Sequence, residues 1–485
     1  MQGVYLDVSA AFDKAWHKAI IAKLEQIQIK GTALDVFRSY LSNRKQIVVI
    51  GQCKSDIKDV QAGIPQGSRL GPLLWLLYIN DIVEDLESET LLFADDTCIF
   101  ASGCDPAITT EILNRDLKKI SVWASKWKVL FNPGKTKEII FSDKFLANSP
   151  PVIFNDIIVS RVFQHKHLGI WLSSTLSWHK QIHELCIRAN AKLAVLRSVK
   201  YLSRSTLDIL YKIQIRSLID YGLVIFYHQL KQTEVARLDQ IQYKAGKLAT
   251  GALHFTSRVK LNLELGWEEL SSRAKFLGLS LFHKIHLNLT RPLIKKCMPI
   301  YRVNFNNTRS GNGYCLFPAA NLKFTQSFFP HFTKEWKNLP SYLKNERDIC
   351  VFKQKLKEVI KPKKYFHFKY GSKRGNTLLT QLRLGRSFLN SHSFQLGMEE
   401  LPVCDICYVE EHNSHFMLTC AFFTDQRDVL FKTVSELVPN FMNFTMKRKL
   451  DILLYGINNN LNVRDCRNVP LTLAVQKYIL STNRF

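Results

Sequence analysis

Apolar positions in the first 175 residues alternate between strand-like and helical spacing. Residues 3–8 form a short apolar run with Asp7 near its end, which predicts a strand. Residues 12–27 place apolar side chains three or four positions apart, which predicts a helix that stops at Gly31. Residues 91–101 hold two apolar runs around a polar centre, which predicts a β-hairpin. The other elements predicted here are a helix at 34–41, a strand at 46–50, a buried helix beginning at Pro72, a helix capped by Asp105, a strand at 137–141 and a hairpin at 162–172.

This order of strand, helices, hairpin, helix and strand predicts a split β-α-β sheet of the ferredoxin-like kind, so we expect an α+β fold. Residues 179–289 turn helical and basic, and residues 291–322 are rich in Asn, Thr, Gly and Pro, which favours a linker. Between Val351 and Arg374, nine Lys or Arg stand against one Glu. The aromatic residues among these charges are Phe352, Tyr365, Phe366, Phe368 and Tyr370. Such a segment suits stacking against single-stranded nucleic acid, although a solvated basic helix face explains it equally well.

Charge is distributed unevenly along the chain. Its 485 residues include 67 Lys and Arg against 41 Asp and Glu, a net charge of +26. The first 100 residues hold 10 basic and 13 acidic side chains (−3), so the rest carries +29. A basic body favours nucleic-acid binding, because phosphates neutralised by Lys and Arg release counterions. Membrane-surface binding is less favoured, since the basic residues do not follow one amphipathic helix.

Cysteine usage and hydropathy bear on the compartment. The chain has 11 Cys, no signal peptide and no apolar run of transmembrane length. These features predict reduced thiols in the nucleus or the cytoplasm, and no membrane partner.

Two local features carry candidate chemistry. Asp95 and Asp96 are adjacent at the predicted hairpin tip, where two carboxylates repel each other unless a cation lies between them. An ordinary surface turn is the alternative. Upstream, Gly63, Gly67 and Gly71 allow a loop backbone to approach a ligand closely, and a glycine-rich connector before a hydrophobic helix is the alternative.

Five motifs occur in one order, namely YLDVSAAFD, GIPQGSRLGPLLW, FADD, FNPGKTKEIIF and HKHLGI. Together they resemble the reverse transcriptases of non-LTR retrotransposons, most closely the jockey and CR1 groups, over about residues 3–290. The resemblance implies a right-hand polymerase with a palm at 1–175, a thumb at 176–290, a linker and element-specific tail at 291–345, a basic aromatic-rich segment at 346–400 and a zinc-knuckle-like module at 401–485. It also implies RNA-directed DNA synthesis, in which a deoxynucleoside triphosphate (dNTP) extends a DNA primer at its 3′-hydroxyl on an RNA template (target-primed reverse transcription).

The same resemblance implies roles for charged residues. Asp7 and Asp95 match the two palm aspartates that hold two Mg²⁺ ions, and Asp96 fills a supporting acidic position. Lys135 matches a lysine that balances or protonates the leaving phosphate, with Lys137 as the alternative.

Other matches lie on the substrate side. Phe12 matches the aromatic ring that lies under the incoming sugar and excludes a 2′-hydroxyl, although a core residue of a helix is a serious alternative. Gln66, Gly67 and Ser68 match the loop that contacts the nucleotide and the template, and Gly169 matches the turn of the primer-grip hairpin.

The spacing C-x2-C-x7-H-x4-C near the C-terminus predicts a structural zinc site. Its four ligands are Cys404, Cys407, His415 and Cys420. His412 is the alternative histidine; the SHFMLTC run, similar to the tail of related elements, favours His415.

The chain also departs from the family pattern. Only six residues precede Asp7, where related elements carry a fingers region, and an apurinic-type endonuclease is absent. The resemblance therefore implies part of a longer polyprotein, or a decayed copy, with fingers and endonuclease expected upstream. We expect weak or no polymerase activity from this chain alone. The alternative function is a catalytically inactive remnant that acts only as a basic RNA-binding protein.

Overall fold

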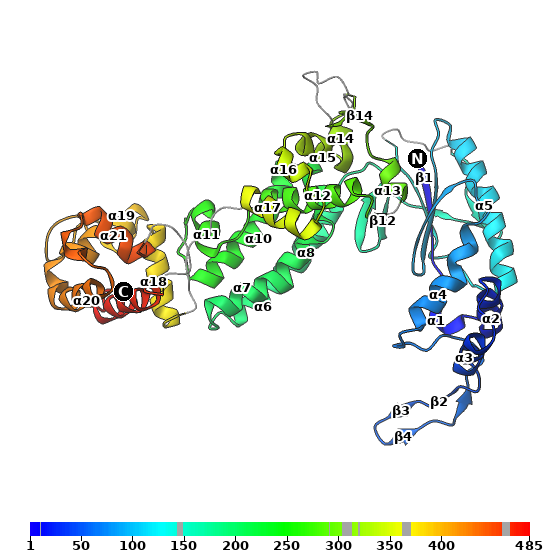
Figure 1. Cartoon of the computed structure of the whole chain (residues 1–485), viewed down its shortest axis with the longest axis horizontal. Coiled ribbons are helices and arrows are strands. Elements are labelled where there is room, and N and C mark those ends of the chain that lie inside the picture. Colours follow the sequence, from blue (N-terminus) through cyan, green and yellow to red (C-terminus); the bar gives the residue numbers. More distant parts are fainter. Residues whose placement is uncertain are drawn as a thin grey trace. The chain divides into compact units, whose positions relative to one another are not determined.

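The computed structural model describes residues 1–9, 11–142, 149–290, 292–302, 313–318, 321–360, 370–457 and 466–485. It divides into two units, Met1–Gln181 and Ile182–Phe485 (Figure 1). Within the described ranges, no helix is both long and apolar enough to cross a membrane. Three aromatic residues of the predicted stacking segment, Tyr365, Phe366 and Phe368, lie outside these ranges.

A five-stranded sheet forms the centre of the first unit. Its strands run in the order β11 (Ser160–Arg161), β8 (Lys137–Ile140), β1 (Gln2–Leu6), β7 (Asp96–Ala101) and β6 (Glu89–Phe93). β11 and β8 are parallel, and the other neighbours are antiparallel. Every residue of the central strand β1 is buried. The strands predicted at 3–8 and 137–141 and the hairpin at 91–101 are confirmed.

One face of this sheet packs against helix α5 (Pro106–Trp127), which runs along it in Figure 1. Val4 and Leu6 of β1 and Ile99 of β7 belong to the core shared with this helix. Successive residues of a strand point to opposite faces. Tyr5 therefore points to the other face, which carries the candidate active site described below.

Helix α5 begins and ends at residues with clear local reasons. Asp105 Oδ1 accepts a hydrogen bond from the Ala107 N–H (2.8 Å), which satisfies a free donor of the first turn, as predicted. Pro106, at the first helical position, lacks an N–H that would have no partner there. The helix ends at Lys128, whose φ of 58° lies in the left-handed region.

The single helix predicted over residues 12–27 is wrong. The structure has two helices, α1 (Ala11–Lys14) and α2 (His17–Gln26). Between them the backbone of Trp16 forms a β-bridge with Ala62 in the glycine-rich loop, and a residue in that conformation cannot continue a helix. Gly31 does not stop α2; it precedes the next helix, α3 (Thr32–Leu41). Apolar spacing continues through this break, so the pattern could not show it.

The helix predicted to be buried all round is buried on one side only. It is α4 (Gly71–Ile79), in which Trp75 and Tyr78 are 1% exposed, whereas Leu73 and Leu76 are each 49% exposed. Nearly every position of α4 is apolar, so its composition did not distinguish the core side from the solvent side.

The remaining strands of the first unit form short antiparallel pairs. The strand predicted at 46–50 is part of a ribbon that extends beyond the helices in Figure 1. The pairs are β2 (Lys45–Gln46) with β5 (Lys58–Asp59), β3 (Val49–Ile50) with β4 (Cys53–Lys54), β9 (Ile153–Phe154) with β10 (Ile157–Ile158), and β12 (Gln164–His167) with β13 (Ile170–Ser173). The last pair is the hairpin predicted at 162–172.

The second unit is mostly helical. Its first helices are α6 (His179–Ser198, which begins in the first unit), α7 (Arg204–Tyr211), α8 (Ser217–Asp220), α9 (Leu223–Phe226), α10 (Gln232–Thr250), α11 (Arg258–Leu265) and α12 (Leu270–His286). Next come α13 (Pro292–Lys296), β14 (Tyr301–Arg302), β15 (Gly313–Tyr314), α14 (Leu322–Thr325), α15 (Phe328–Lys337), α16 (Ser341–Lys344) and α17 (Ile349–Ile360). The helical character expected of residues 179–289 is confirmed.

The later part of the segment 291–345, expected to be a linker and an element-specific tail, is packed into this unit. Phe332 and Trp336 of α15 and Leu343 of α16 are buried in one core with Phe282 of α12. Phe352 of α17, one of the aromatic residues expected to stack on nucleic acid, is fully buried in the same core. Residues 321–345 are therefore part of a folded helical body, because their apolar side chains are buried against those of α12 and α17.

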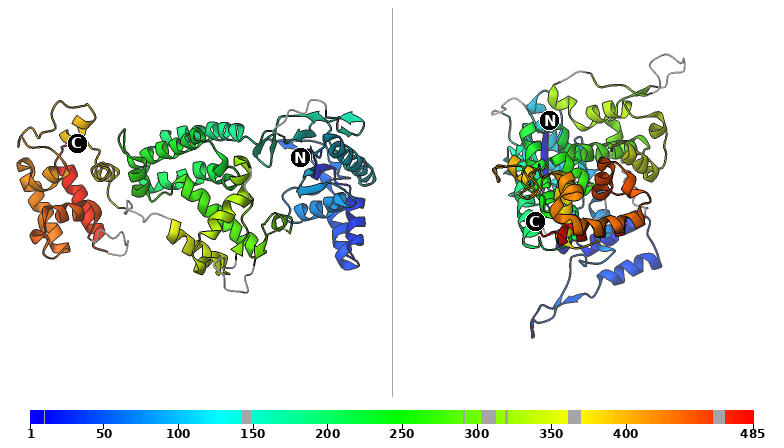
Figure 2. Two further views of the ribbon diagram at one scale, coloured as in Figure 1. Left: turned by 90° about the horizontal axis from the view of Figure 1, so that it is seen from above. Right: turned by 90° about the vertical axis from the view of Figure 1, so that its left-hand side faces the viewer.

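A further core lies toward the C-terminus. It is built from α18 (Lys373–Leu384), α19 (Asn390–Gln395), α20 (Thr424–Leu437), α21 (Met446–Tyr455) and α22 (Asn468–Ser481), coloured yellow to red in Figure 2. Leu378 and Leu382 of α18 share this core with Cys420 and Phe416. The C-terminal module therefore starts with α18 and not at residue 401, because α18 supplies part of its apolar interior.

Candidate active site and metal centre

The adjacent aspartates lie at the tip of the hairpin, as predicted. Phe93 of β6 pairs with Asp96 of β7, which leaves Ala94 and Asp95 as a two-residue turn. Ala94 has a φ of 54°, a conformation that glycine more often adopts in such turns. Asp95 and Asp96 are both exposed at this end of the sheet.

Asp7 lies beside this tip because of strand register. β1 and β7 are neighbours, and their last antiparallel pair is Leu6 with Thr97. Asp7 and Asp96 are the next residues on the two strands, so they occupy the same end of the sheet. Asp7 Oδ2 is buried and has no hydrogen-bond partner. The fold thus brings Asp7 and Asp96 together, although they are 89 residues apart in the sequence.

The acids influence one another electrostatically. Partial burial raises the pKa of Asp96, and the charges of Asp95 and Asp7 raise it further, while the nearby His167 lowers it. In the described part of the chain, however, Asp7, Asp95 and Asp96 are not among the side chains that converge in threes or more around one possible metal position. The three acids are therefore neighbours at one end of the sheet, and their oxygens do not converge as a set of three within the described residues.

A lysine reaches the same end of the sheet from the loop before β8. The Nζ of Lys135 lies 3.6 Å from Asp7 Oδ2. Its loop is held in place because the Asn132 N–H donates to the Asp7 carbonyl oxygen (2.8 Å). Lys137, the alternative, instead donates from Nζ to the Gly134 carbonyl oxygen (2.7 Å). Of the two lysines, Lys135 is the one that contacts an acid of the site.

The β12–β13 hairpin contacts the site face of the sheet. Its two-residue turn consists of Leu168 (φ 48°) and Gly169 (φ 81°), the tight turn expected at this motif. The ring centroids of His165 and His167 lie 4.3 and 4.9 Å from that of Tyr5, which is on the central strand.

These two histidines are residues that the sequence analysis missed. Burial lowers the pKa of His165 to about 4, and His167 and Lys137 act in the same direction. Burial also lowers the pKa of His167, although the Asp96 charge opposes this. Both imidazoles are therefore neutral near pH 7. Their signal was in the sequence: two His at alternate positions of one strand point to one face.

Phe12 is placed between core and site. It is half-buried, and its ring centroid lies 5.6 Å from that of Trp75. The Ile64 N–H donates to the Phe12 carbonyl oxygen (2.7 Å), so this residue is tied to the glycine-rich loop. Packing against the core is therefore part of its role.

The glycine-rich loop is shaped by its own hydrogen bonds. Gln66 Nε2 donates to Asp13 Oδ1 (2.8 Å), which fixes an otherwise exposed amide against α1. Ser68 Oγ accepts from the Gly71 N–H (2.9 Å) and so caps the start of α4. Gly67 has a φ of 81°, and a Cβ added there would meet no atom within 4 Å. Its backbone is thus open to a ligand.

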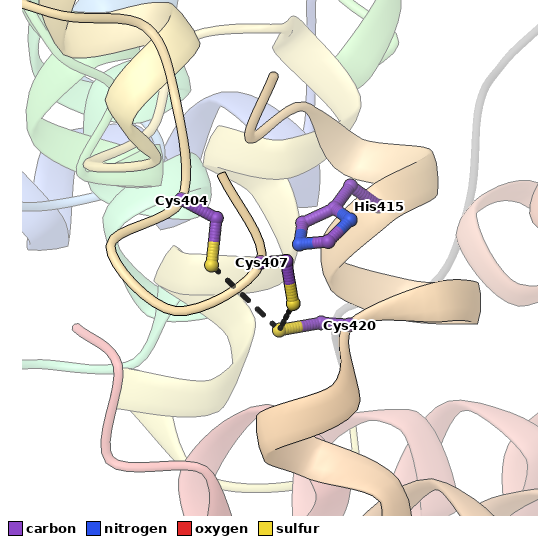
Figure 3. Close-up of side chains that lie close together, drawn as sticks. All are labelled: Cys404, Cys407, His415 and Cys420. Carbon is purple, nitrogen blue, oxygen red and sulfur yellow. Dashed lines mark hydrogen bonds between the residues drawn. The ribbon is translucent and has the colours of Figure 1, made fainter. Parts of the chain in front are cut away.

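The predicted zinc ligands converge in the second unit (Figure 3). One ligand atom from each of Cys404, Cys407, His415 and Cys420 lies within 4.8 Å of all the others. The Sγ of Cys420 is 4.0 Å from that of Cys404 and 3.9 Å from that of Cys407. Tetrahedral zinc with sulfur ligands at about 2.3 Å requires sulfur–sulfur distances of about 3.8 Å. The four side chains therefore fit a zinc ion.

The structure distinguishes the two candidate histidines. His415 is 5% exposed, and its Nε2 is buried without a hydrogen-bond partner, so this nitrogen is available as a metal ligand. His412 is exposed, and both ring nitrogens are engaged, Nδ1 with the Glu410 carbonyl oxygen (2.9 Å) and Nε2 with Ser414 Oγ (3.0 Å). The geometry favours His415.

Backbone groups support the sulfur atoms. The Ala421 N–H donates to Cys407 Sγ (3.4 Å), a bond that lowers the pKa of this thiol. Tyr408 has a φ of 56°, and its N–H donates to the Cys404 carbonyl oxygen (2.9 Å), which closes the tight turn between the first two cysteines. Such contacts orient metal ligands before the metal binds.

Comparison with known proteins assigns a family to the part of the chain that contains the sheet. Residues 3–202 match the family described as reverse transcriptase (RNA-dependent DNA polymerase). This part of the chain is a reverse transcriptase domain. It is similar to the probable RNA-directed DNA polymerase from transposon X-element of Drosophila melanogaster, with 30% identity over 54% of this chain and 30% of the relative. It is also similar to the RNA-directed DNA polymerase from mobile element jockey of Drosophila funebris, with 29% identity over 37% of this chain and 20% of the relative.

The expected reverse transcriptase family is confirmed for this domain, and its matching relatives are named as polymerases of mobile elements. The mixed α+β fold of the first unit agrees with the expected fold class. The chain matches less than a third of the length of these two relatives. Among solved structures, a telomerase from Candida albicans matches at 12% identity over 53% of this chain and 48% of that chain, with a TM-score of 0.27, too low to bear on the fold.

Proposed function

We propose that the reverse transcriptase domain catalyses RNA-templated transfer of nucleotides from a dNTP to the 3′-hydroxyl of a DNA primer, as in target-primed reverse transcription. The observation that carries this proposal is the register of β1 and β7, which puts Asp7 beside the Asp95-Asp96 turn. In this proposal the first unit serves as the palm, and the helices that follow it, to about residue 290, serve as the thumb. The nucleic-acid partners are an RNA template and a DNA primer.

The acidic end of the sheet suits divalent cations. Mg²⁺ prefers carboxylate oxygen, and Asp7 Oδ2 is a buried carboxylate oxygen with no hydrogen-bond partner. Burial, and then the charges of Asp95 and Asp7, raise the pKa of Asp96, and a bound cation would offset this repulsion between the acids. Asp7 and Asp95 would hold two Mg²⁺ ions with Asp96 in support. Bound there, the two ions supply activation of the primer hydroxyl and charge stabilisation of the leaving pyrophosphate.

The chain's own residues perform the remaining tasks. Lys135, next to Asp7, balances negative charge on the departing phosphate. Phe12 supports the sugar of the incoming nucleotide and excludes a 2′-hydroxyl. The loop with Gln66, Gly67 and Ser68 contacts the incoming nucleotide and the template. The turn at Gly169 positions the end of the primer.

A primer-extension assay on poly-rA/oligo-dT with Mg²⁺ tests this proposal. We expect weak extension by the chain alone. Asp95→Asn should lower the rate of primer extension about 10³-fold or more, because each 1.4 kcal/mol of lost charge stabilisation lowers the rate about tenfold. Asp35→Asn, at an exposed aspartate of α3, is the matched control and should leave extension unchanged. Extension that survives Asp95→Asn refutes the assignment.

A second measurement separates a metal site from a remnant without turnover. Fe²⁺ in place of Mg²⁺, with ascorbate and peroxide, cleaves the backbone next to a bound metal. We expect cuts near residues 7 and 95 that Asp95→Asn abolishes and Asp35→Asn does not. RNA binding with neither extension nor these cuts would favour the alternative, a basic RNA-binding protein without catalysis.

For the second unit we propose a structural Zn²⁺ held by Cys404, Cys407, His415 and Cys420. The converging ligand atoms and the free Nε2 of His415 support it. Because two of the cysteines are buried in the core of the C-terminal module, the metal joins the 404–420 loop to that core.

Zinc content measured on the purified chain tests this site with a matched pair of histidine variants. We expect one zinc per chain, retained in His412→Ala and lost or bound much more weakly in His415→Ala. The reverse result would assign the site to His412, and zinc retained in both variants would remove histidine from the ligand set.

A further inference from the structure

The segment that carries the metal ligands differs in charge from the rest of the chain. Residues 394–431 contain seven acidic residues and one arginine, a net charge of −6 within a chain of +26. The acidic residues are Glu399, Glu400, Asp405, Glu410, Glu411, Asp425 and Asp428, and all except Glu411 are exposed. A surface of this sign repels phosphate, whereas the rest of the chain attracts it.

Three arginines contact this segment in the described part of the chain. Arg427 donates to the Cys420 carbonyl oxygen (2.6 Å). Arg484 pairs with the buried Glu411 (2.6 Å), and Arg386 donates to Gln395 (3.1 Å). The seven carboxylates of the segment outnumber these three arginines, so its local charge stays negative.

Large apolar side chains are exposed on the same loop. Tyr408 is 80% exposed, and Phe422 is 61% exposed. Leu401, Ile406 and Val409 are also exposed, each by half or more. The bond from the Ala421 N–H to Cys407 Sγ places Phe422 next to the stretch that holds Ile406 and Tyr408. Exposed apolar patches with a polar rim mark interaction sites. We call these five side chains with the exposed carboxylates the zinc-loop surface.

We propose that the zinc-loop surface binds a lysine- and arginine-rich polypeptide segment that also carries apolar side chains. Charge complementarity selects this partner, because basic side chains pair with the exposed carboxylates while apolar ones cover Tyr408 and Phe422. Aromatic side chains alone would also suit the bases of single-stranded RNA, but such sites combine stacking with a positive groove, and this surface is negative. The surface thus serves a different partner from the basic remainder of the chain.

The test uses the full-length, zinc-loaded chain and two fluorescent probes, a synthetic amphipathic Lys/Leu peptide and a single-stranded RNA oligonucleotide. We expect Tyr408→Ser/Phe422→Ser and, separately, Glu399→Lys/Glu400→Lys to weaken peptide binding about tenfold or more. Glu436→Lys is the matched control, because it lies about 18 Å further along α20 from Thr424 and should leave peptide binding unchanged. RNA affinity should stay constant in the serine variant and should not fall in the lysine variant.

Three outcomes would overturn the proposal. Peptide binding unaffected by either double variant, with the zinc content intact, excludes this surface as its site. Loss of RNA affinity in the serine variant assigns the surface to nucleic acid. Self-association of the chain in sedimentation experiments, abolished by the same substitutions, assigns it to a second copy.

Discussion

A stacked pair of histidines in the second unit makes its stability depend on pH. The ring centroids of His228 and His331 are 3.7 Å apart. Burial lowers the pKa of His228 to about 4, His331 and Lys275 act in the same direction, and Glu335 opposes them. The Nε2 of His228 is buried without a hydrogen-bond partner, so a proton added there has no acceptor.

The magnitude follows from the difference between the folded and unfolded pKa values. Above about pH 6.5, His228 is neutral in both states and its full contribution to stability is present. As the pH falls from 6.5 toward 4, only the unfolded chain takes up the proton, so stability is lost in this window. At pH 5 the loss amounts to about 2 kcal/mol for a pKa near 4 against 6.5.

The substitution His228→Phe keeps an aromatic ring in the stack and removes the titration. We expect the free energy of unfolding, measured with urea, to fall less between pH 8 and pH 5 in the variant than in the parent, by about 2 kcal/mol. His254→Phe, at an exposed histidine of the same unit, is the control and should keep the parent's pH dependence. An unchanged pH dependence in His228→Phe would refute the argument that burial keeps this imidazole neutral.

Two other substitutions probe the core of the second unit and the active site. Glu264→Gln should destabilise the chain by about 3–5 kcal/mol in urea unfolding, because it leaves two buried arginines without their carboxylate. Glu264 Oε1 lies 3.3 Å from Arg204 and 3.2 Å from Arg383, and all three side chains are buried. A loss of stability below about 1 kcal/mol would show that water replaces the carboxylate. Phe12→Ala should raise ribonucleotide incorporation relative to deoxynucleotide incorporation in primer extension, and an unchanged ratio with lowered stability would make Phe12 a core residue only.

The sequence by itself determined the features that depend on neighbouring residues. Alternating apolar runs predicted the hairpin whose tip holds Asp95 and Asp96, and the Asp105-Pro106 pair predicted the start of α5. The zinc quartet was also visible, because its ligands lie within 17 residues. Each of these signals is short in range, so backbone propensity and spacing are sufficient to reveal it.

Only the tertiary structure decided what depends on contacts between distant segments. The break between α1 and α2 arises from the pairing of Trp16 with Ala62, and the choice of His415 over His412 rests on which imidazole is buried. The meeting of Asp7 with Asp96 depends on the register of β1 against β7. A one-residue slip of that register would turn each side chain to the other face of the sheet, and apolar periodicity along one strand contains no information about its partner.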